Sequence, residues 1–441
     1  MTPSPLAGPL LTDLYEITMA AGYWAHDIRD RATFSVFVRN PDQNRNFFVA
    51  AGLETILQEL EAYRFNPEDI SYLKSLKLFD PNFLKTLQRL KFTGDVYALP
   101  EGTLFFPDEP ILEITAPIIE GQLIETLVLN TIGIATLIAT KASRCMHAAA
   151  GRPLVDFALR RTHGQAAGNQ VARSTYIAGF AATSNVQAGQ KFGIPVAGTM
   201  AHAFVTAFDS ELDAFRAYAA TFPQNSIFLI DTYDTIAGAR NAATVALEMQ
   251  ALGHTALGVR LDSGDMVALS RDVRRILDEA GLPGMKIYAS SGFDEAKIDA
   301  ILRAGAPIDA FGIGTRVGVS ADAPYLDIVY KLVRLGNRNI RKLSTGKITL
   351  AGEKQVFRRL DASGMYREDI IACREEALAD AQPLLELVMA RGRKIKPTMT
   401  LVDIRANFEK NFVRLDQRYK NIHRHLAFPV RISARLDALQ K

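Results

Sequence analysis

The sequence predicts an α/β protein in which a parallel-sheet domain is joined to a mixed α+β domain. Two observations predict this fold class. In the middle of the chain, short runs of Val, Ile, Leu and Phe alternate with helix-like stretches, which is typical of strands buried on both faces. In the flanking regions, apolar and polar residues alternate, which is typical of antiparallel strands with one solvated face. We therefore expect an α/β domain at residues 141–335 and a mixed α+β domain formed by residues 1–140 and 336–441.

Seven apolar runs predict the strands of the parallel sheet. They lie at residues 153–159, 194–198, 226–231, 256–261, 285–290, 308–314 and 326–333. The stretches between them have a helical period: in residues 271–280, Val273, Ile276 and Leu277 share one face and charged residues occupy the other. Because strand–helix–strand crossovers are right-handed, this alternation predicts an α/β barrel or a doubly wound sheet.

The mixed domain is predicted by alternating segments on both sides of the parallel sheet. Residues 32–40 and 94–106 have the alternation of antiparallel strands, with turn residues between them. Similar short strands return at residues 341–352 and 354–362. The end of the chain is therefore expected to complete the first domain.

Composition limits the partners and the compartment. Lys and Arg number 51 against 48 Asp and Glu, so the net charge of +3 argues against nucleic acid or an anionic membrane as the main partner. Cys145 and Cys373 form no disulfide or zinc pattern, which fits a reducing cytoplasm. Asp13 and Glu16 interrupt any signal peptide, and the apolar run 126–140 is too short to span a bilayer, so we expect a buried helix there.

Polar or glycine-bearing groups follow six of the predicted strands. The carboxyl ends of barrel strands share one mouth, where such enzymes keep their active sites. Strand ends are often polar simply because they are loops, but six coincidences favour a common site. The groups are Arg160, Thr199 to His202, Asp231, Arg260 with Asp262, Ser290 to Gly292, and Gly312 to Arg316.

The segment GVRLDSGD, residues 258–265, carries the clearest anion-binding pair. The planar fork of Arg260 suits a carboxylate or phosphate, and Asp262 suits ribose hydroxyls or a magnesium-bound anion. The alternative is an internal ion pair, which is weak evidence of stability. Asp231 is a candidate to orient a histidine or bind magnesium, whereas Asp234 and Asp265 are also explained as helix N-caps.

Two glycine-rich loops, SSGFDE at residues 290–295 and GIGTRVG at residues 312–318, predict phosphate binding. Their backbone amides can approach a phosphate closely, and barrels often bind phosphate at their last loops. Neither loop is a P-loop or a dinucleotide fingerprint. Phe157 and Arg160 offer an aromatic face beside a cation, which suits a flat anionic ring, although Phe157 is also explained as a core residue.

His202 differs from the other six histidines because it follows a predicted strand directly. That position suits a nucleophile or a base, and Asp231 is a candidate to fix its tautomer.

Six motifs together show a close resemblance to a known family. The chain resembles the nicotinate phosphoribosyltransferases over nearly its whole length. The motifs are LLTDLYEITMAAGYW at 10–24, FALRRTHG at 157–164, TSNVQAG at 183–189, GTMAHAFVTAF at 198–208, GVRLDSGD at 258–265 and GIGTRVG at 312–318.

The resemblance implies an irregular seven-stranded α/β barrel with a second, sandwich-like domain. It implies synthesis of nicotinate mononucleotide and pyrophosphate from nicotinate and 5-phosphoribosyl 1-pyrophosphate, coupled to ATP hydrolysis through phosphorylated His202. Tyr15 and Phe157 would sandwich the pyridine ring, and Thr199 and Arg260 would contact nicotinate. Homodimers of the family share their sites across the interface.

The remaining site residues follow from the same resemblance and from the loops above. Thr315 would hold the ribosyl phosphate, with Ser291, Gly292, Gly312 and Gly314 as further phosphate contacts. Asp231 and Asp262 are the candidates for Mg²⁺ or ribose.

Two alternatives to this function stay open. Nicotinamide-using relatives carry an aspartate where this chain has Ser184, and an aspartate would repel the carboxylate of nicotinate. Ser184 therefore favours the acid over the amide. A non-catalytic nucleotide-sensing protein on the same scaffold would not need His202, Asp231, Arg260 and Asp262 together.

Overall fold

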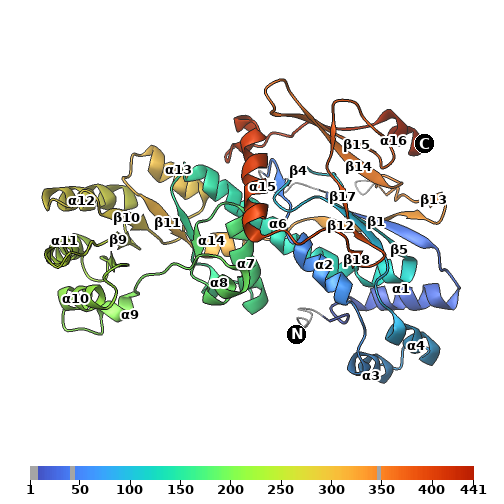
Figure 1. The fold of residues 1–441 in the computed structure, drawn as a ribbon, viewed down its shortest axis with the longest axis horizontal. Coiled ribbons are helices and arrows are strands. Elements are labelled where there is room, and N and C mark those ends of the chain that lie inside the picture. Colours follow the sequence, from blue (N-terminus) through green and yellow to red (C-terminus); the bar gives the residue numbers. More distant parts are fainter. Residues whose placement is uncertain (1–7, 40–44, 345–348) are drawn as a thin grey trace. The chain divides into compact units, whose positions relative to one another are not determined.

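The computed structural model describes residues 8–39, 45–344 and 349–441. The chain divides into two compact units: unit 1 comprises Met1–Thr140 and Tyr325–Lys441, and unit 2 comprises Lys141–Pro324 (Figure 1). The long helix α6 (Glu125–Ala148) runs from one unit into the other.

Unit 1 is built on a seven-stranded sheet whose strands come from both ends of the chain. In spatial order they are β13 (Arg338–Asn339), β12 (Ile328–Leu335), β1 (Arg31–Val38), β5 (Leu112–Pro117), β3 (Asp95–Ala98), β17 (Glu386–Ala390) and β18 (Arg393–Lys394). All the pairs are antiparallel. Phe34 of β1 stacks on Tyr330 of β12 with ring centroids 4.7 Å apart, so the return strand packs directly into the core.

Smaller sheets and the remaining helices complete unit 1. One sheet has the order β16 (Gln382–Pro383), β14 (Lys354–Leu360), β15 (Tyr366–Cys373) and β19 (Val430–Ile432), and another pairs β2 (Phe48–Val49) with β4 (Leu104–Phe105). The helices are α1 (Leu14–Ala25), α2 (Leu53–Ala62), α3 (Pro67–Ser75), α4 (Pro81–Arg89), α5 (Ile118–Leu123), α15 (Leu401–Arg414) and α16 (Ala434–Leu439), with a 3₁₀ turn at Gln417–Lys420. Both α3 and α15 begin at capping boxes, at Asn66 and Thr400.

Unit 2 contains a six-stranded parallel sheet. Its order is β7 (Ala182–Thr183), β6 (Leu154–Asp156), β11 (Ala310–Ile313), β10 (Lys286–Ala289), β9 (Gly258–Leu261) and β8 (Ile227–Leu229). Phe228, Val259, Ile287 and Ile313 are fully buried. Burial on both faces explains why these strands are continuous apolar runs in the sequence.

Helices connect the strands of unit 2 and lie outside the sheet, with α10 packed on α11 and α11 on α12 (Figure 1). Two positions in unit 2 must be glycine because neighbouring backbone approaches them closely. A Cβ on Gly238 would lie 2.1 Å from the Ile230 carbonyl oxygen, and a Cβ on Gly258 would lie 2.1 Å from the Lys286 carbonyl oxygen. The helices are α7 (Gln165–Ile177), α8 (Val186–Phe192), α9 (His202–Val205), α10 (Glu211–Thr221), α11 (Thr235–Ala251), α12 (Met266–Glu279), α13 (Glu295–Arg303) and α14 (Thr315–Gly318), with a 3₁₀ turn at Leu159–Arg161.

Two strand assignments made from the sequence are wrong. The run 326–333 pairs antiparallel with β1 in unit 1 and is not part of the parallel sheet. The run 194–198 makes only a parallel bridge between Val196 and Thr183, because Pro195 has no N–H to continue a ladder. The short strand β7 takes the place beside β6 instead.

The predicted seven-stranded barrel is accordingly not seen as a closed structure. The sheet of unit 2 ends at the bridge of Val196 beside β7 on one edge and at β8 on the other, and the described residues show no pairing between these two edges. The sequence also predicts a strand within residues 341–352. The described residues of this stretch, 341–344 and 349–352, form no strand.

Helix α6 contains the apolar run 126–140 identified in the sequence. By length and composition it is apolar enough to cross a membrane, but 67% of its most apolar window is buried inside the protein. It therefore has the character of a core helix.

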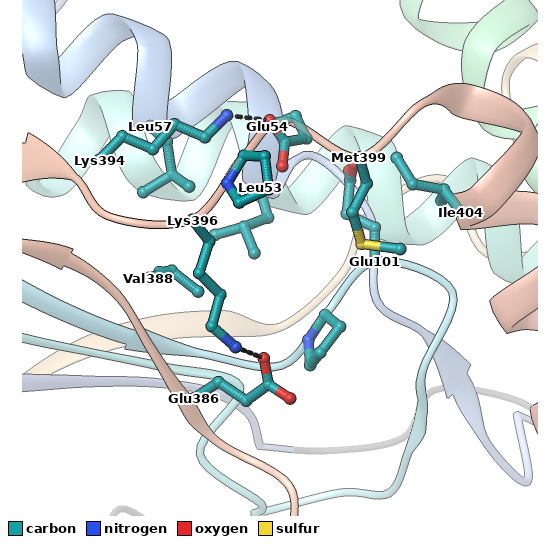
Figure 2. A pocket seen from close by; sticks show the side chains of 12 residues that line it. Leu53, Glu54, Leu57, Glu101, Glu386, Val388, Lys394, Lys396, Met399 and Ile404 are labelled. Carbon is teal, nitrogen blue, oxygen red and sulfur yellow. Dashed lines mark hydrogen bonds and ion pairs between the residues drawn. The ribbon is translucent and has the colours of Figure 1, made fainter.

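A narrow pocket in unit 1 lies between α2 and the strand β17 (Figure 2). Leu53, Leu57 and Val388 line it, and the ion pairs Lys394–Glu54 and Lys396–Glu386 flank it. Its volume of about 50 Å³ is close to that of one or two water molecules, each of about 30 Å³. This pocket is too small for a substrate of the size of a nucleotide.

Candidate active site

The carboxyl ends of β8 and β9 bring four of the predicted residues together. Asp231 follows β8, Arg260 and Asp262 lie at the end of β9, and His202 is the first residue of α9. The Nε2 atom of His202 lies 4.0 Å from Oδ1 of Asp231 and 3.8 Å from Oδ2 of Asp262. These residues, scattered over the sequence, form one cluster.

Asp231 is the buried anchor of this cluster, with 1% of its side chain exposed. Its Oδ2 accepts hydrogen bonds from the backbone N–H of Asp262 at 3.2 Å and from the hydroxyl of Ser263 at 2.5 Å. Its Oδ1 is buried and has no hydrogen-bond partner among the described residues. A buried carboxylate oxygen without a partner is costly, so it marks a place where a ligand, ion or water is expected.

Arg260 is held in a fixed orientation at the end of β9. Nη2 donates to the Met200 carbonyl at 2.7 Å, and Nη1 donates to the Ser290 hydroxyl at 3.1 Å and to Asp262 Oδ1 at 3.4 Å. Ser290 also donates to Asp262. Burial lowers the pKa of Arg260 below its ordinary value, and the charge of Arg160 lowers it further. The charges of Asp262 and Asp231 raise this pKa but do not outweigh burial.

His202 is anchored on one side of its ring and open on the other. Its Nδ1 lies 3.1 Å from the Thr232 hydroxyl, and 45% of the side chain is exposed. With two carboxylates near Nε2, a proton on Nε2 is favoured, so we expect Nδ1 to accept from Thr232. Thr199 lies three residues earlier, and its hydroxyl donates to the carbonyl of Met200, the same carbonyl that Arg260 uses.

Phe157 packs against the glycines of the last loop. A Cβ on Gly312 would lie 2.3 Å from Cε2 of the Phe157 ring, and one on Gly314 would lie 3.2 Å from the Phe157 carbonyl oxygen. Gly312 is therefore required by the position of the ring. The backbone N–H of Phe157 donates to the Ile313 carbonyl at 2.8 Å, which fixes the end of β6 against β11.

The two loops predicted to bind phosphate leave neighbouring parallel strands. Ser291 and Gly292 follow β10 with φ of 96° and 66°, so Ser291 adopts a strained left-handed backbone. Gly314 and Thr315 follow β11 at the start of α14, and Thr315 is exposed. The backbone N–H of Ser184, after β7, donates to the Asp156 carbonyl at 2.8 Å, which places Ser184 beside the end of β6.

Tyr15 belongs to unit 1, on α1, and 46% of it is exposed. Burial of its hydroxyl and the charge of Glu125 raise the pKa of Tyr15 above its ordinary value.

The structure adds Thr232, which the sequence analysis missed, because a single hydroxyl residue carries no recognisable spacing. It also gives Ser263 and Ser290, which lie in segments singled out from the sequence, the role of connecting Asp231, Asp262 and Arg260. Asp234 and Asp265, left open between ligand and cap, accept hydrogen bonds from the first turns of α11 and α12 and are N-caps.

Fold and site together are typical of an α/β enzyme that binds its ligand at the carboxyl edge of a parallel sheet. A carboxylate pair, a buried arginine and glycine-rich loops meet at the carboxyl edge of a parallel sheet, where such enzymes bind their ligands. The family profile of the nicotinate phosphoribosyltransferase N-terminal domain matches residues 10–133, and that of the nicotinate phosphoribosyltransferase family matches residues 153–346. The chain belongs to the nicotinate phosphoribosyltransferase family.

Known relatives extend over most of the chain. Nicotinate phosphoribosyltransferase pncB2 of Mycobacterium tuberculosis is 47% identical over 398 residues, which cover 90% of this chain and 85% of the relative. The enzyme of Bacillus subtilis is 38% identical and covers 96% of this chain and 92% of its own. A crystal structure of human nicotinic acid phosphoribosyltransferase superposes with a TM-score of 0.88 at 31% identity, over 97% of this chain and 99% of that one.

Proposed function

We propose that the chain joins nicotinate to 5-phosphoribosyl 1-pyrophosphate and so makes nicotinate mononucleotide for NAD salvage. Relatives named for this activity support the proposal. The observation that carries it in the structure is the unpartnered, buried Oδ1 of Asp231 beside His202 and Asp262. An anionic substrate with its counter-ion would satisfy this oxygen.

The reaction explains why these residue types lie together. The pyridine nitrogen forms a bond to C1′ of the ribose, and the bond from C1′ to pyrophosphate breaks, so pyrophosphate leaves with the electron pair. Positive charge develops on the ribose and negative charge on the leaving group. In the proposed arrangement, Asp231 and Asp262 face the ribose, and the loop amides hold its 5′-phosphate.

Nicotinate is assigned to the space beside Phe157. Phe157 would stack on one face of the pyridine ring, and Tyr15 of a second copy would cover the other face, as the shared sites of the family imply. Arg260 and Thr199 would bind the carboxylate. Ser184 offers a neutral donor at the same strand edge, which suits an acid better than an aspartate would. The phosphates are assigned to a set of groups at the ends of β6, β10 and β11: Arg160, Ser291, Gly292, Gly312, Gly314 and Thr315.

Magnesium fits the carboxylate pair. Mg²⁺ is usually held by one or two carboxylates and by substrate phosphates. Asp231 offers its unpartnered Oδ1, and the side chain of Asp262 is partly exposed. Within the described residues no group of three or more His, Cys, Asp or Glu side chains forms a metal site, so substrate oxygens would complete the shell. When bound, the ion would neutralise charge on the pyrophosphate.

His202 is proposed to accept the γ-phosphoryl group of ATP. A bond forms between an imidazole nitrogen and phosphorus while the bond to the ADP oxygen breaks, and ADP leaves with the electron pair. The exposure of the ring supports this role, as do Thr232 beside Nδ1 and the carboxylates of Asp231 and Asp262 near Nε2. Asp231 and Asp262 would retain the ring proton during the transfer.

The test is a reaction with nicotinate, 5-phosphoribosyl 1-pyrophosphate, Mg²⁺ and γ-labelled ATP. We expect nicotinate mononucleotide, ADP and an alkali-stable label on the protein. His202→Ala should lose the label and the stimulation by ATP, whereas His254→Ala, at a histidine outside the cluster, should keep both. If His202→Ala keeps both, His202 is not the phosphorylated residue.

The same assay separates the alternatives. A nicotinamide-specific enzyme would use the amide, and Ser184→Asp would change little. A nucleotide sensor would bind these ligands without turnover. Product from nicotinate that exceeds product from nicotinamide excludes both.

Three broader features belong to the proposal. The six paired strands and the bridge at Val196 supply seven segments for the irregular barrel expected from the family. A homodimer with shared sites rests on family analogy. A cytoplasmic location is supported by two free, buried cysteines.

A further inference from the structure

One carboxylate ties the two phosphate loops of unit 2 together. Oδ1 of Asp294 accepts the backbone N–H of Lys297 at 2.9 Å and so caps α13. Oδ2 accepts Nη1 of Arg316 at 2.6 Å. The side chain of Asp294 is 13% exposed and that of Arg316 is 54% exposed, so only the carboxylate end of this ion pair is shielded from solvent.

The position of Arg316 makes this pair more than a local contact. Arg316 directly follows Thr315, and Asp294 lies two residues after Gly292. Strands β10 and β11 are parallel neighbours, with Ala289 opposite Phe311, so their loops leave the sheet at the same edge. The Asp294–Arg316 pair therefore sets the spacing between the two loops.

The loop after β10 depends on the start of α13 for its shape. Ser291 holds a left-handed backbone, which a non-glycine residue keeps only when its surroundings fix it. Its carbonyl accepts a hydrogen bond from Nζ of Lys297 at 2.8 Å, one turn into α13. Movement of the α13 cap would release this strained residue.

Unit 2 fixes the start of α13 from its other side. Glu295, next to Asp294, is buried and pairs with Lys141 at 2.5 Å and with Arg144 at 2.8 Å, both on α6. Lys141 also pairs with Asp322 at 2.7 Å, six residues after Arg316. The segment that contains Thr315 is thus held at Arg316 and again at Asp322.

We propose that Arg316 is a positioning residue for the ribosyl phosphate of 5-phosphoribosyl 1-pyrophosphate. Acting through Asp294, it holds Thr315 at a fixed distance from the backbone of Ser291 and Gly292, so that both loops meet one phosphate. The charge of Arg316 is already neutralised by Asp294, so its contribution is the spacing of the loops. This inference rests on the proposed function, because it assigns the phosphate of that substrate.

The test is a double-mutant cycle on the full chain with Arg316→Gln and Asp294→Asn. Asparagine caps a helix as well as aspartate does, so Asp294→Asn removes the charge and keeps the cap. We expect each variant to raise KM for 5-phosphoribosyl 1-pyrophosphate about tenfold, with KM for nicotinate within about twofold of the wild type. The double variant should be no worse than either single one. Arg316→Lys should restore part of the affinity, since it keeps one donor.

A matched control uses an ion pair on the same helix. Arg303→Gln removes the exposed Arg303–Asp299 pair of α13, whose atoms lie 2.9 Å apart, and should leave both KM values unchanged. A merely structural role for Arg316 would instead lower the thermal midpoint and kcat without a selective effect on one substrate.

Three results overturn the inference. If Arg316→Gln raises this KM and Asp294→Asn does not, Arg316 contacts the phosphate directly. If the two effects multiply in the double variant, the residues act separately. If neither variant changes KM, the pair sets no spacing.

Failure of the proposed function would look different. The wild-type chain would then make no nicotinate mononucleotide, while calorimetric titration with 5-phosphoribosyl 1-pyrophosphate would still show weaker binding in both single variants if the clamp exists.

Discussion

Gly312→Ala tests whether the placement of Phe157 matters for catalysis. The new Cβ would lie 2.3 Å from Cε2 and 2.5 Å from Cδ2 of the Phe157 ring. Two nonbonded carbons need about 3.5 Å, so the ring edge must retreat by about 1.2 Å from the 2.3 Å contact. A misplacement of about 1 Å can reduce a rate by about 100-fold. We therefore expect kcat/KM for nicotinate to fall by about 10- to 100-fold, and overpacking to cost about 1–3 kcal/mol of stability.

The assay is steady-state formation of nicotinate mononucleotide with varied nicotinate, together with urea unfolding. Gly284→Ala is the matched control, because a Cβ there meets nothing within 4 Å. It should leave activity and stability unchanged. If Gly312→Ala loses stability but keeps kcat/KM for nicotinate, Phe157 is a core residue and its assignment to the pyridine ring is refuted.

Three further predictions concern buried charges. Arg260→Lys should raise KM for nicotinate about tenfold or more, since one ammonium cannot replace the planar fork, and an unchanged KM would remove Arg260 from the site. Burial would raise the pKa of Glu295, but the charges of Lys141 and Arg144 outweigh burial and lower this pKa below 4.5. The stability that the pairing contributes is therefore complete above pH 4.5, and it is lost as the pH falls through the lowered pKa of the folded state. Glu295→Gln should therefore cost about 3 kcal/mol in urea unfolding at pH 7 and much less in acid, and an equal loss at both would contradict the pairing. Burial raises the pKa of Asp156 above 3.8, so the folded state binds the carboxyl proton more tightly than the unfolded state does. Stability therefore falls as the pH rises from 3.8 through the raised pKa of the folded state. Asp156→Asn should flatten that part of the stability–pH curve.

The parallel sheet could be predicted because its strands are buried on both faces. The runs that became β6, β8, β9, β10 and β11 have no alternation, and the structure places them in one sheet. The run that became β12 has the same composition, but its partner is set by β1, almost 300 residues earlier in the chain. A local pattern does not contain that pairing. The very short β7 offers too few residues for any pattern.

The site could be predicted where its residues stand at strand ends. Asp231, Arg260 and Asp262 meet because the carboxyl ends of parallel strands share an edge, and His202 reaches them from the start of α9. The hydroxyl of Thr232 could not be found in this way, because its role depends on the angle at which α9 presents His202.

The split of unit 1 in the chain has a consequence for biosynthesis. When residues 1–140 have left the ribosome, β1 has only β5 beside it, and its other edge stays open until β12 is made. An open strand edge is a site for wrong pairing with other chains. Unit 2 is continuous and can fold while it is synthesised. The amino-terminal segment must therefore wait through about 180 residues, or about 10–40 seconds at elongation rates of about 5–20 residues per second. The price of building one sheet from both ends of the chain is this interval of exposure, during which chaperones would be most needed.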